Sequence, residues 1–191
     1  MDESESSEAR LWRRGLDGDA GAFGEIFDLH KDRVFRHAFR LLLDRHDAED
    51  VTGTVFLELW RRRTGVRVVN GSLLPWLLVT TGHAAANTRR STSRYRKLLD
   101  RIPRGEHPPA VEDEALARLA PLGEELHEAL QQLGPVDRSL ATLVIVEGYP
   151  IKDAAELLNL THAAAKTRLS RAKTRLRTSL APALSAQGDL S

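Results

Sequence analysis

The chain has 191 residues, of which 41% are hydrophobic and 29% charged, and its formal net charge at pH 7 is +1. This composition is normal for a soluble protein with one ordinary domain or two small ones. The absence of cysteine excludes disulfides, thiolate chemistry and Cys-based zinc sites, and no run approaches the roughly 18 apolar residues of a membrane span.

The first segment, MDESESSEAR, is acidic rather than apolar and does not resemble a signal peptide. We therefore predict that residues 1–18 form an acidic, disordered N-terminus and that the protein works in the cytoplasm.

Two amphipathic helices are predicted between residues 23 and 63, because apolar residues recur there at helical spacing. The apolar positions are Phe23, Ile26, Phe27, Val34, Phe35, Ala38, Phe39 and Leu42, then Val51, Val55, Phe56, Leu59 and Trp60. The acids of the second helix crowd its first turn, where the helix dipole favours negative charge.

A turn at Asn70-Gly71 leads into a third long helix, predicted to begin near Pro75, since proline is tolerated in a first helical turn. The later part of this helix is basic: between Arg61 and Arg104 the cations face a single acid, Asp100. Residues 103–122 contain prolines, a glycine and acids, and this composition is typical of a linker. Two further helices are expected after it, broken at Gly134-Pro135.

The last part of the chain has the pattern of a helix-turn-helix. A short helix over 151–158 is followed by Asn159, which tolerates positive φ, and by Thr161 as the N-cap of a second helix. That helix carries one apolar stripe, formed by Ala165, Leu169, Ala172, Leu176 and Leu180. Its other faces bear Lys and Arg without any acid, which favours DNA binding over the alternative of a merely solvated amphipathic helix.

No strand alternation or internal repeat is visible, so we predict an all-α fold. It comprises two small helical domains, 19–102 and 123–180, joined by the flexible linker 103–122, with a tail at 181–191. The C-terminal domain is the helix-turn-helix.

Three segments resemble the extracytoplasmic-function (ECF) sigma factors of bacterial RNA polymerase, and they cover most of 19–180. The first, DAEDVTGTVFLELWRRR, is similar to the family's polymerase-binding helix, and the second, LLPWLLVTTGHAAANTRRSTSRYRKLL, to its segment for the promoter −10 element. The third, PIKDAAELLNLTHAAAKTRLSRAKTRLR, resembles its last helix-turn-helix, which reads the −35 element.

The resemblance implies a factor that directs core polymerase to specific promoters and starts transcription. The implied −35 contacts are Thr161, His162, Ala164, Lys166, Thr167, Arg168, Arg171 and Lys173. The implied −10 contacts are His83, Asn87, Arg89, Arg90, Arg94 and Arg96. The implied contacts with core polymerase are Asp47, Glu49, Asp50, Val55, Phe56, Leu59 and Trp60. Trp76 and Tyr95 are candidates for stacking on single-stranded bases, with a core position as the alternative for Trp76.

The partners implied by the resemblance are the clamp helices of the largest polymerase subunit, the flap of the second largest, promoter DNA and, as is usual in the family, an anti-sigma factor. Some positions depart from the family pattern, with His83 where Asn is frequent and Ala164 where Thr is usual, so the promoter sequence is not carried over.

Three other classes compete with this interpretation: an enzyme, a stand-alone regulator, and an adaptor or anti-sigma-type interaction protein, for which the basic blocks would be unnecessary. No nucleotide-binding loop, metal-binding helix motif or nucleophile elbow is present, so we predict neither catalysis nor a cofactor or metal. A stand-alone helix-turn-helix regulator would account for 151–177 but would leave the first two segments unexplained.

Overall fold

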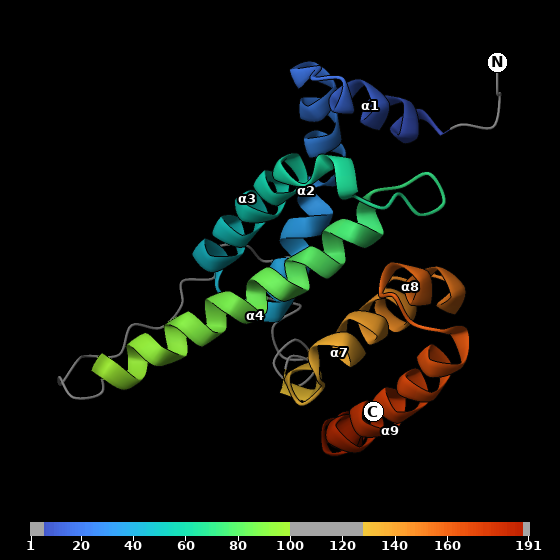
Figure 1. Ribbon diagram of the computed structural model, residues 1–191. Helices are drawn as coiled ribbons and strands as arrows, with labels where there is room; N and C mark the ends of the chain where they lie inside the picture. The colour runs from blue at the N-terminus through green and yellow to red at the C-terminus, as the bar shows by residue number, and fades with distance from the viewer. Residues whose placement is uncertain (1–5, 100–127, 189–191) are drawn as a thin grey trace.

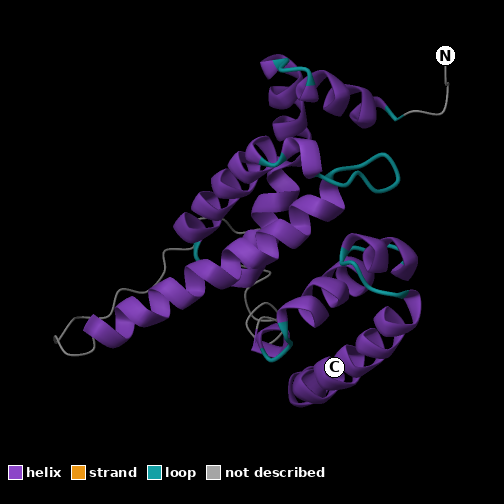
Figure 2. Ribbon diagram, in the orientation of Figure 1, coloured by secondary structure: helices purple, strands orange, loops and turns teal. Residues whose placement is uncertain are grey.

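The computed structural model of the protein describes residues 6–99 and 128–188, without the side chains of 93–99 and 182–188. These residues are helical apart from turns and one isolated bridge between Val69 and Ser72 (Figure 2), so the predicted all-α fold is confirmed. The labelled helices are α1 (Ser7–Leu16), α2 (Ala20–Leu42), α3 (Arg45–Arg61), η1 (Arg63–Gly65), α4 (Leu74–Leu99), α7 (Pro135–Ala141), η2 (Thr142–Val146), α8 (Ile151–Leu157) and α9 (His162–Gly188). The predicted linker, 103–122, lies outside the described residues.

Helices α2, α3 and α4 pack together around the N-terminal core, and their ends are set by local side chains. The carboxylate of Asp19 accepts a hydrogen bond from the Ala22 amide at the start of α2, and Asp44 accepts one from Asp47 at the start of α3. Leu43, at φ 55°, ends α2 in the left-handed conformation. The buried core residues include Ile26, Val34, Phe39, Val51, Val55, Phe56, Leu59, Leu73 and Leu77.

The N-terminal prediction is wrong over residues 7–16, because these form the helix α1 rather than a disordered segment. Ser6 caps the helix, its hydroxyl accepting from the Ala9 amide at 3.1 Å, and Trp12 is buried against the N-terminal core. The remaining anchor is Glu8, whose carboxylate lies 2.7 Å from the His30 ring nitrogen and accepts from the Leu73 amide at 2.6 Å. Helix α1 therefore ties the start of α4 to α2.

The carboxyl group of Glu8 is largely buried, which by itself would favour its neutral form. Burial pushes its pKa upward, but the hydrogen bonds from His30 and from the Leu73 amide outweigh that effect and hold the pKa below its usual value. The carboxylate is therefore charged at neutral pH, and its partners explain why an acid can lie between three helices.

The C-terminal domain has the local structure predicted for a helix-turn-helix. Asn159 has φ 54°, and the Thr161 hydroxyl accepts from the Ala164 amide at 3.2 Å, as an N-cap does. Pro135 stands in the first turn of α7, directly after the break at Gly134. The apolar stripe of α9 is buried at Ala165, Leu169, Ala172 and Leu176, with Leu180 partly buried.

The two domains pack directly against each other, and Figure 1 shows α7 and α8 beside α4. Two apolar clusters contain residues of both. In the first cluster, Leu41 and Ala85 pack with apolar side chains of the C-terminal domain. In the second cluster, Leu74 and Leu78 of α4 pack with other apolar side chains of that domain. His37 of α2 is buried in this region and lines a small cavity with Ser139 and Thr142, and burial, together with the charge of Arg40, lowers its pKa to about 3.

Candidate nucleic-acid interface

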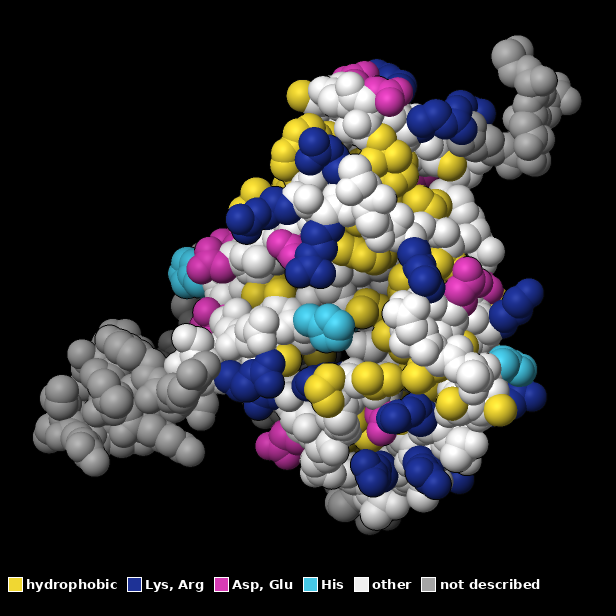
Figure 3. Space-filling model, viewed as in Figure 1, with side chains coloured by type: hydrophobic (Ala, Val, Ile, Leu, Met, Phe, Trp, Pro, Cys, Tyr) yellow, Lys and Arg dark blue, Asp and Glu magenta, His cyan; other side chains and the backbone are white. Residues whose placement is uncertain are grey.

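Helix α9 presents a basic, exposed face opposite its buried apolar stripe. The exposed residues among the predicted −35 contacts are Thr161, His162, Lys166, Thr167, Arg168, Arg171 and Lys173, while Ala164 is half-buried. Lys and Arg side chains are visible in Figure 3 over the part of the molecule where α9 lies in Figure 1. Because the stripe consists of alanines and leucines packed on α7 and α8, the charged face is held outward.

Arg168 differs from the other predicted −35 contacts, because its guanidinium lies 2.7 Å from the carboxylate of Asp137 in α7. Both side chains keep some exposure, so this ion pair contributes little to the free energy of unfolding. It does fix the direction of the Arg168 side chain. Arg168 thus orients α9 on α7 in this structure, in addition to any contact with DNA.

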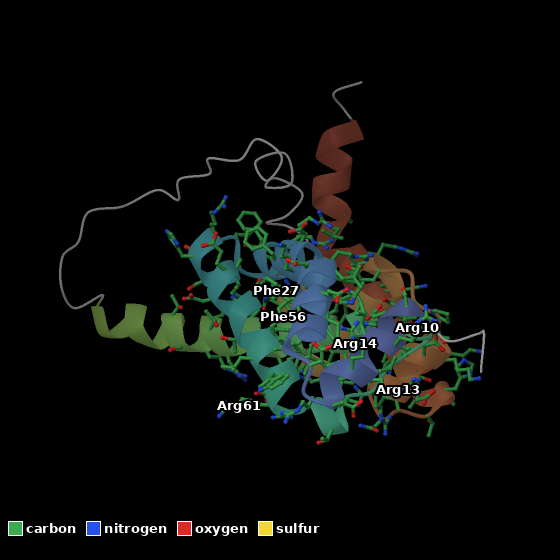
Figure 4. All side chains as sticks on the ribbon, turned by 90° about the horizontal axis from the view of Figure 1, so that it is seen from above. Arg10, Arg13, Arg14, Phe27, Phe56 and Arg61 are labelled. Atoms are coloured by element: carbon green, nitrogen blue, oxygen red, sulfur yellow. The ribbon has the colours of Figure 1, made fainter. Side chains whose placement is uncertain are left out.

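The predicted −10 contacts lie along α4, whose C-terminal end projects beyond the neighbouring helices in Figures 1 and 4. His83, Asn87 and Arg90 are exposed and Arg89 is half-buried. The Asn87 amide oxygen accepts from the Arg90 guanidinium at 2.6 Å, which aligns these two side chains. The side chains of Arg94, Tyr95 and Arg96 lie outside the described residues.

The His83 imidazole stands close to the C-terminal domain. Partial burial lowers its pKa, and the positive charge of Arg138 in α7 lowers it further, which favours the neutral ring. A neutral imidazole can donate to or accept from a base edge, but it does not attract phosphate as a cation would. Trp76, at the other end of α4, is half-buried against the N-terminal core, which supports the core alternative over base stacking.

The polymerase-contact prediction for α3 needs a correction. Val55, Phe56 and Leu59 are buried inside the N-terminal core and offer no surface to a partner. Trp60 is half-buried, with its ring 5.2 Å from that of Phe23 and the Arg63 guanidinium 4.5 Å above it. The resemblance covers residues that build the core as well as residues that face outward. Val55, Phe56 and Leu59 belong to the first kind, whereas the half-buried Trp60 remains a predicted contact.

The acids of α3 remain on its surface. Glu49 and Asp50 are exposed, and Asp47 is half-buried in the first turn. The Glu49 carboxylate lies 3.0 Å from the Arg45 guanidinium, and both side chains are exposed. Such an i, i+4 ion pair contributes little free energy, so a basic group of a partner could replace Arg45 at small cost.

Three exposed apolar side chains on α2 and α3 were missed as surface candidates. Leu57 is 56% exposed, Leu29 is 55% exposed, and Phe27 is 36% exposed with its ring edge 4.7 Å from the Phe56 ring. Figure 4 labels Phe27 and Phe56 close together between the two helices, with Arg61 at the end of α3 and Arg10, Arg13 and Arg14 along α1. The sequence did contain a signal for Leu57, because Leu57 does not lie on the apolar stripe that Val55 and Leu59 form.

Within the described ranges, 6–99 and 128–188, no helix is long and apolar enough to cross a membrane. Within the same ranges, no group of three or more His, Asp or Glu side chains is arranged to hold a metal ion.

Comparison with protein families gives two matches, in an order that parallels the two domains. Residues 26–95 match the model of sigma-70 region 2, and residues 123–176 match that of sigma-70 region 4. The first covers α3 and most of α2 and α4; the second includes α7 and α8 and extends into α9.

Curated relatives carry the same family name. The ECF RNA polymerase sigma factor SigE of Mycolicibacterium smegmatis is 29% identical over 172 residues, covering 86% of this chain and 65% of that protein. SigK of Mycobacterium tuberculosis is 28% identical over 173 residues, covering 89% and 91%. The first two such relatives, SigE and BldN of Streptomyces coelicolor, are longer proteins, and the match spans 65% of each.

Solved structures share the fold at low identity. CnrH, in complex with the cytosolic domain of CnrY, aligns with a TM-score of 0.61 at 19% identity, covering 93% of this chain and 99% of that one. The sigma factor RpoE of Bartonella quintana, in complex with the anti-sigma factor NepR, aligns with a TM-score of 0.54 at 21% identity, covering 83% and 96%. Since the region 2 and region 4 matches together span more than half of the chain, and relatives named as ECF sigma factors align across nearly all of it, the chain belongs to the ECF group of the sigma-70 family.

Proposed function

We propose that this protein is a sigma factor that directs core RNA polymerase to specific promoters and initiates transcription there. The observation that carries the proposal is the exposed basic face of α9 in region 4, together with a region 2 match that includes the arginine-bearing helix α4. It acts in the cytoplasm as a binding factor, without a catalytic reaction of its own.

The C-terminal domain, 123–180, reads the −35 element as duplex DNA. An α-helix fits the major groove with its N-terminal residues near base edges and its later cations at phosphates. On α9 the first exposed residues are Thr161 and His162, followed by Lys166, Arg171 and Lys173. Early residues would therefore specify sequence, while the later cations supply affinity that weakens with salt.

The N-terminal domain, 19–102, reads the −10 element with α4. Arginines can follow the backbone of a separated strand, and Arg89, Arg90, Arg94 and Arg96 recur along the half of α4 that projects from the molecule. Asn87, held by Arg90, offers an amide for a base edge.

Core polymerase binds the outer faces of α2 and α3. The acids Glu49 and Asp50 face a basic partner surface, and the exposed Leu57 supplies the apolar contact that the buried residues of α3 do not. In the polymerase this partner is the clamp of the largest subunit, with the flap of the second largest held by the C-terminal domain. By analogy with RpoE, which was solved with an anti-sigma factor, we propose such an inhibitor as a further partner.

The stand-alone regulator is the second candidate, since α8 and α9 by themselves have the geometry of a DNA-binding module. It leaves the region 2 match and the exposed Leu57 without a role. The two candidates differ in whether the protein needs core polymerase to act.

Co-elution with purified core polymerase in size-exclusion chromatography, followed by run-off transcription, tests the proposal. We expect the protein to elute with core and to produce transcripts that core alone does not make. If it stays separate from core, yet binds duplex DNA alone, the stand-alone regulator replaces the sigma factor.

A further inference from the structure

One cation of α9 is paired with an acid of another helix, and in this it differs from its neighbours along α9. Between residues 166 and 177 the chain carries six Lys and Arg side chains and no acid. Among these cations, Arg168 lies 2.7 Å from the carboxylate of Asp137, which stands in the first turn of α7. The others form no ion pair within the described part of the chain: Lys166, Arg171, Lys173, Arg175 and Arg177.

Arg168 lies at the edge of the exposed face of α9 that we assign to the −35 element. Residues three or four positions apart are neighbours on one side of a helix, so Arg168 stands between Ala164 and Arg171. The Arg168 side chain is 45% exposed, whereas that of Asp137 is 20% exposed. The guanidinium therefore remains accessible to solvent at this edge while Asp137 holds it from the side of α7.

The packing of α9 on α7 sets the geometry of the ion pair. Ala165 and Leu169, on the buried side of α9, lie in one apolar cluster with Leu140 of α7. Asp137 precedes Leu140 by three positions, so the two side chains leave α7 on the same side, one turn apart. The pair of Asp137 and Arg168 is therefore built into the C-terminal domain, because the elements that position it are α7 and α9.

The pair changes the charge of α9 more than it changes the stability of the fold. An ion pair between partly exposed side chains contributes little to the free energy of unfolding. A guanidinium that faces a carboxylate at contact distance attracts a phosphate only weakly, because the two opposite charges largely cancel. The Asp137 carboxylate also repels a phosphate that approaches Arg168. The edge of α9 next to α7 is therefore less attractive to DNA than its sequence indicates.

Attraction to phosphates is the part of DNA binding that carries no sequence information. Each phosphate contact with duplex DNA adds about 0.9 to the steepness with which log K falls against log salt. A cation that is withheld from phosphate therefore lowers the affinity for duplex DNA of any sequence. Base contacts near the start of α9, at Thr161 and His162 in our assignment, are left in place.

We propose that Asp137 is a positioning residue that withholds Arg168 from DNA phosphates and so limits the sequence-independent affinity of this protein for DNA. The consequence for transcription rests on the proposed function. Genomic DNA offers a large excess of non-specific sites, and a protein bound to them is not available to core polymerase. By weakening this competition, Asp137 keeps more of the free protein available for assembly with core.

A double-mutant cycle on the full chain tests the inference. Binding to a fluorescein-labelled duplex of mixed sequence is followed by fluorescence anisotropy between about 50 and 200 mM salt. Asp137→Asn keeps the size of the side chain and removes its charge, so Arg168 becomes available to phosphate. We expect the affinity at the lowest salt to rise about three- to tenfold and the salt slope to become steeper by about 0.9.

The effect of Arg168→Ala should depend on residue 137. In the wild-type background Arg168 makes no phosphate contact, so Arg168→Ala should leave the salt slope nearly unchanged. In the Asp137→Asn background the same change should remove the new contact and reduce the steepness by about 0.9. An equal change of slope in the two backgrounds would overturn the inference, because the charges of residues 137 and 168 would then act independently.

Two further variants serve as matched controls. Glu156→Gln removes one acid from an exposed position of α8, and the effect of Arg168→Ala should be the same with and without it. Arg171→Ala removes an exposed cation three positions after Arg168 and should reduce the steepness by about 0.9 in both the wild-type and the Asp137→Asn backgrounds. Melting temperatures from circular dichroism should stay close to that of the wild type, since the pair contributes little stability.

Run-off transcription tests the consequence for assembly with core. The protein is first mixed with unlabelled duplex of mixed sequence, and core polymerase and template are then added. Asp137→Asn should lose transcription at a competitor concentration about three- to tenfold lower than wild type does. Equal sensitivity to the competitor would contradict a role of Asp137 in keeping the protein available to core. If wild-type protein makes no transcripts with core even without competitor, the proposed function fails, and the salt slopes still decide whether Asp137 withholds Arg168.

Discussion

Helices α3 and α9 differ in how well the residues of their family motifs divide into a buried face and an exposed face. On α9 the predicted contacts with DNA point outward, because alanines and leucines alone form the buried stripe. On α3 the matching segment mixes core residues with surface residues, and Val55, Phe56 and Leu59 turn out to be core. A family motif therefore marks a functional helix, whereas burial decides which of its residues can bind a partner.

A matched pair of leucines on α3 gives the largest expected effect. Leu59 is fully buried and Leu57 is 56% exposed, so Leu59→Ala should lower the free energy of unfolding by about 2–5 kcal/mol, and Leu57→Ala by less than about 0.5 kcal/mol. Urea denaturation measures both. Binding to core polymerase should instead be weakened by Leu57→Ala. Equal destabilisation by the two changes would contradict the assignment of inner and outer faces.

Acid should destabilise the protein through His37, which is buried between the two domains. In the unfolded chain this imidazole takes up a proton near pH 6.5, but in the folded protein its pKa is about 3. The folded state is therefore stabilised above pH 6.5, and that stabilisation is lost as the pH falls from 6.5 toward 3. The slope is at most roughly 1.4 kcal/mol per pH unit for one proton.

Denaturation midpoints between pH 7 and pH 5 check this prediction. His37→Asn should flatten the pH dependence, and His46→Asn, a change at an exposed histidine of α3, should leave it as in wild type. An unchanged slope in His37→Asn would show that other groups cause the acid sensitivity.

The turn between α8 and α9 should give an effect of intermediate size. Thr161→Ala removes the hydroxyl that accepts from the Ala164 amide and should cost about 1 kcal/mol. Asn159→Ala should cost a similar amount, because alanine is strained at φ 54°, whereas Asn159→Gly relieves that strain. Thermal unfolding followed by circular dichroism measures all three, and equal effects of Gly and Ala at position 159 would argue against the left-handed turn.

The smallest change is expected at the outer face of α9. Arg171→Ala should weaken binding to duplex −35 DNA across sequences and reduce the slope of log K against log salt by about one unit, as the loss of one phosphate contact does. Lys31→Ala, which removes a cation from α2, is the control. A salt slope that Arg171→Ala leaves unchanged would remove this residue from the proposed interface.

The parts of the structure that could be predicted from the sequence are those set by neighbours in the chain. The left-handed Asn159, the Thr161 cap and the stripe of α9 each depend on residues within a few positions. Helix α1 has one local signal, its Ser6 cap, but its other supports are distant in sequence: Trp12 enters a core built by later helices, and Glu8 bonds to His30 and Leu73.

The junction between the domains could not be predicted for the same reason. The ion pairs of Glu147 join residues more than one hundred positions apart, and no local pattern reports such a contact. The π-helix η2, where the backbone amide of Glu147 donates to the Thr142 carbonyl at 3.0 Å, likewise has no signal in the apolar run of residues 142–146.

The most direct test of the proposed function is run-off transcription from a promoter library by core polymerase, with and without the protein. We predict new transcripts whose templates share two sequence blocks, one near −10 and one near −35, and no selection of these templates by the protein without core. Templates that share a single block, bound equally well in the absence of polymerase, would contradict the assignment of the two reading helices to one initiation factor.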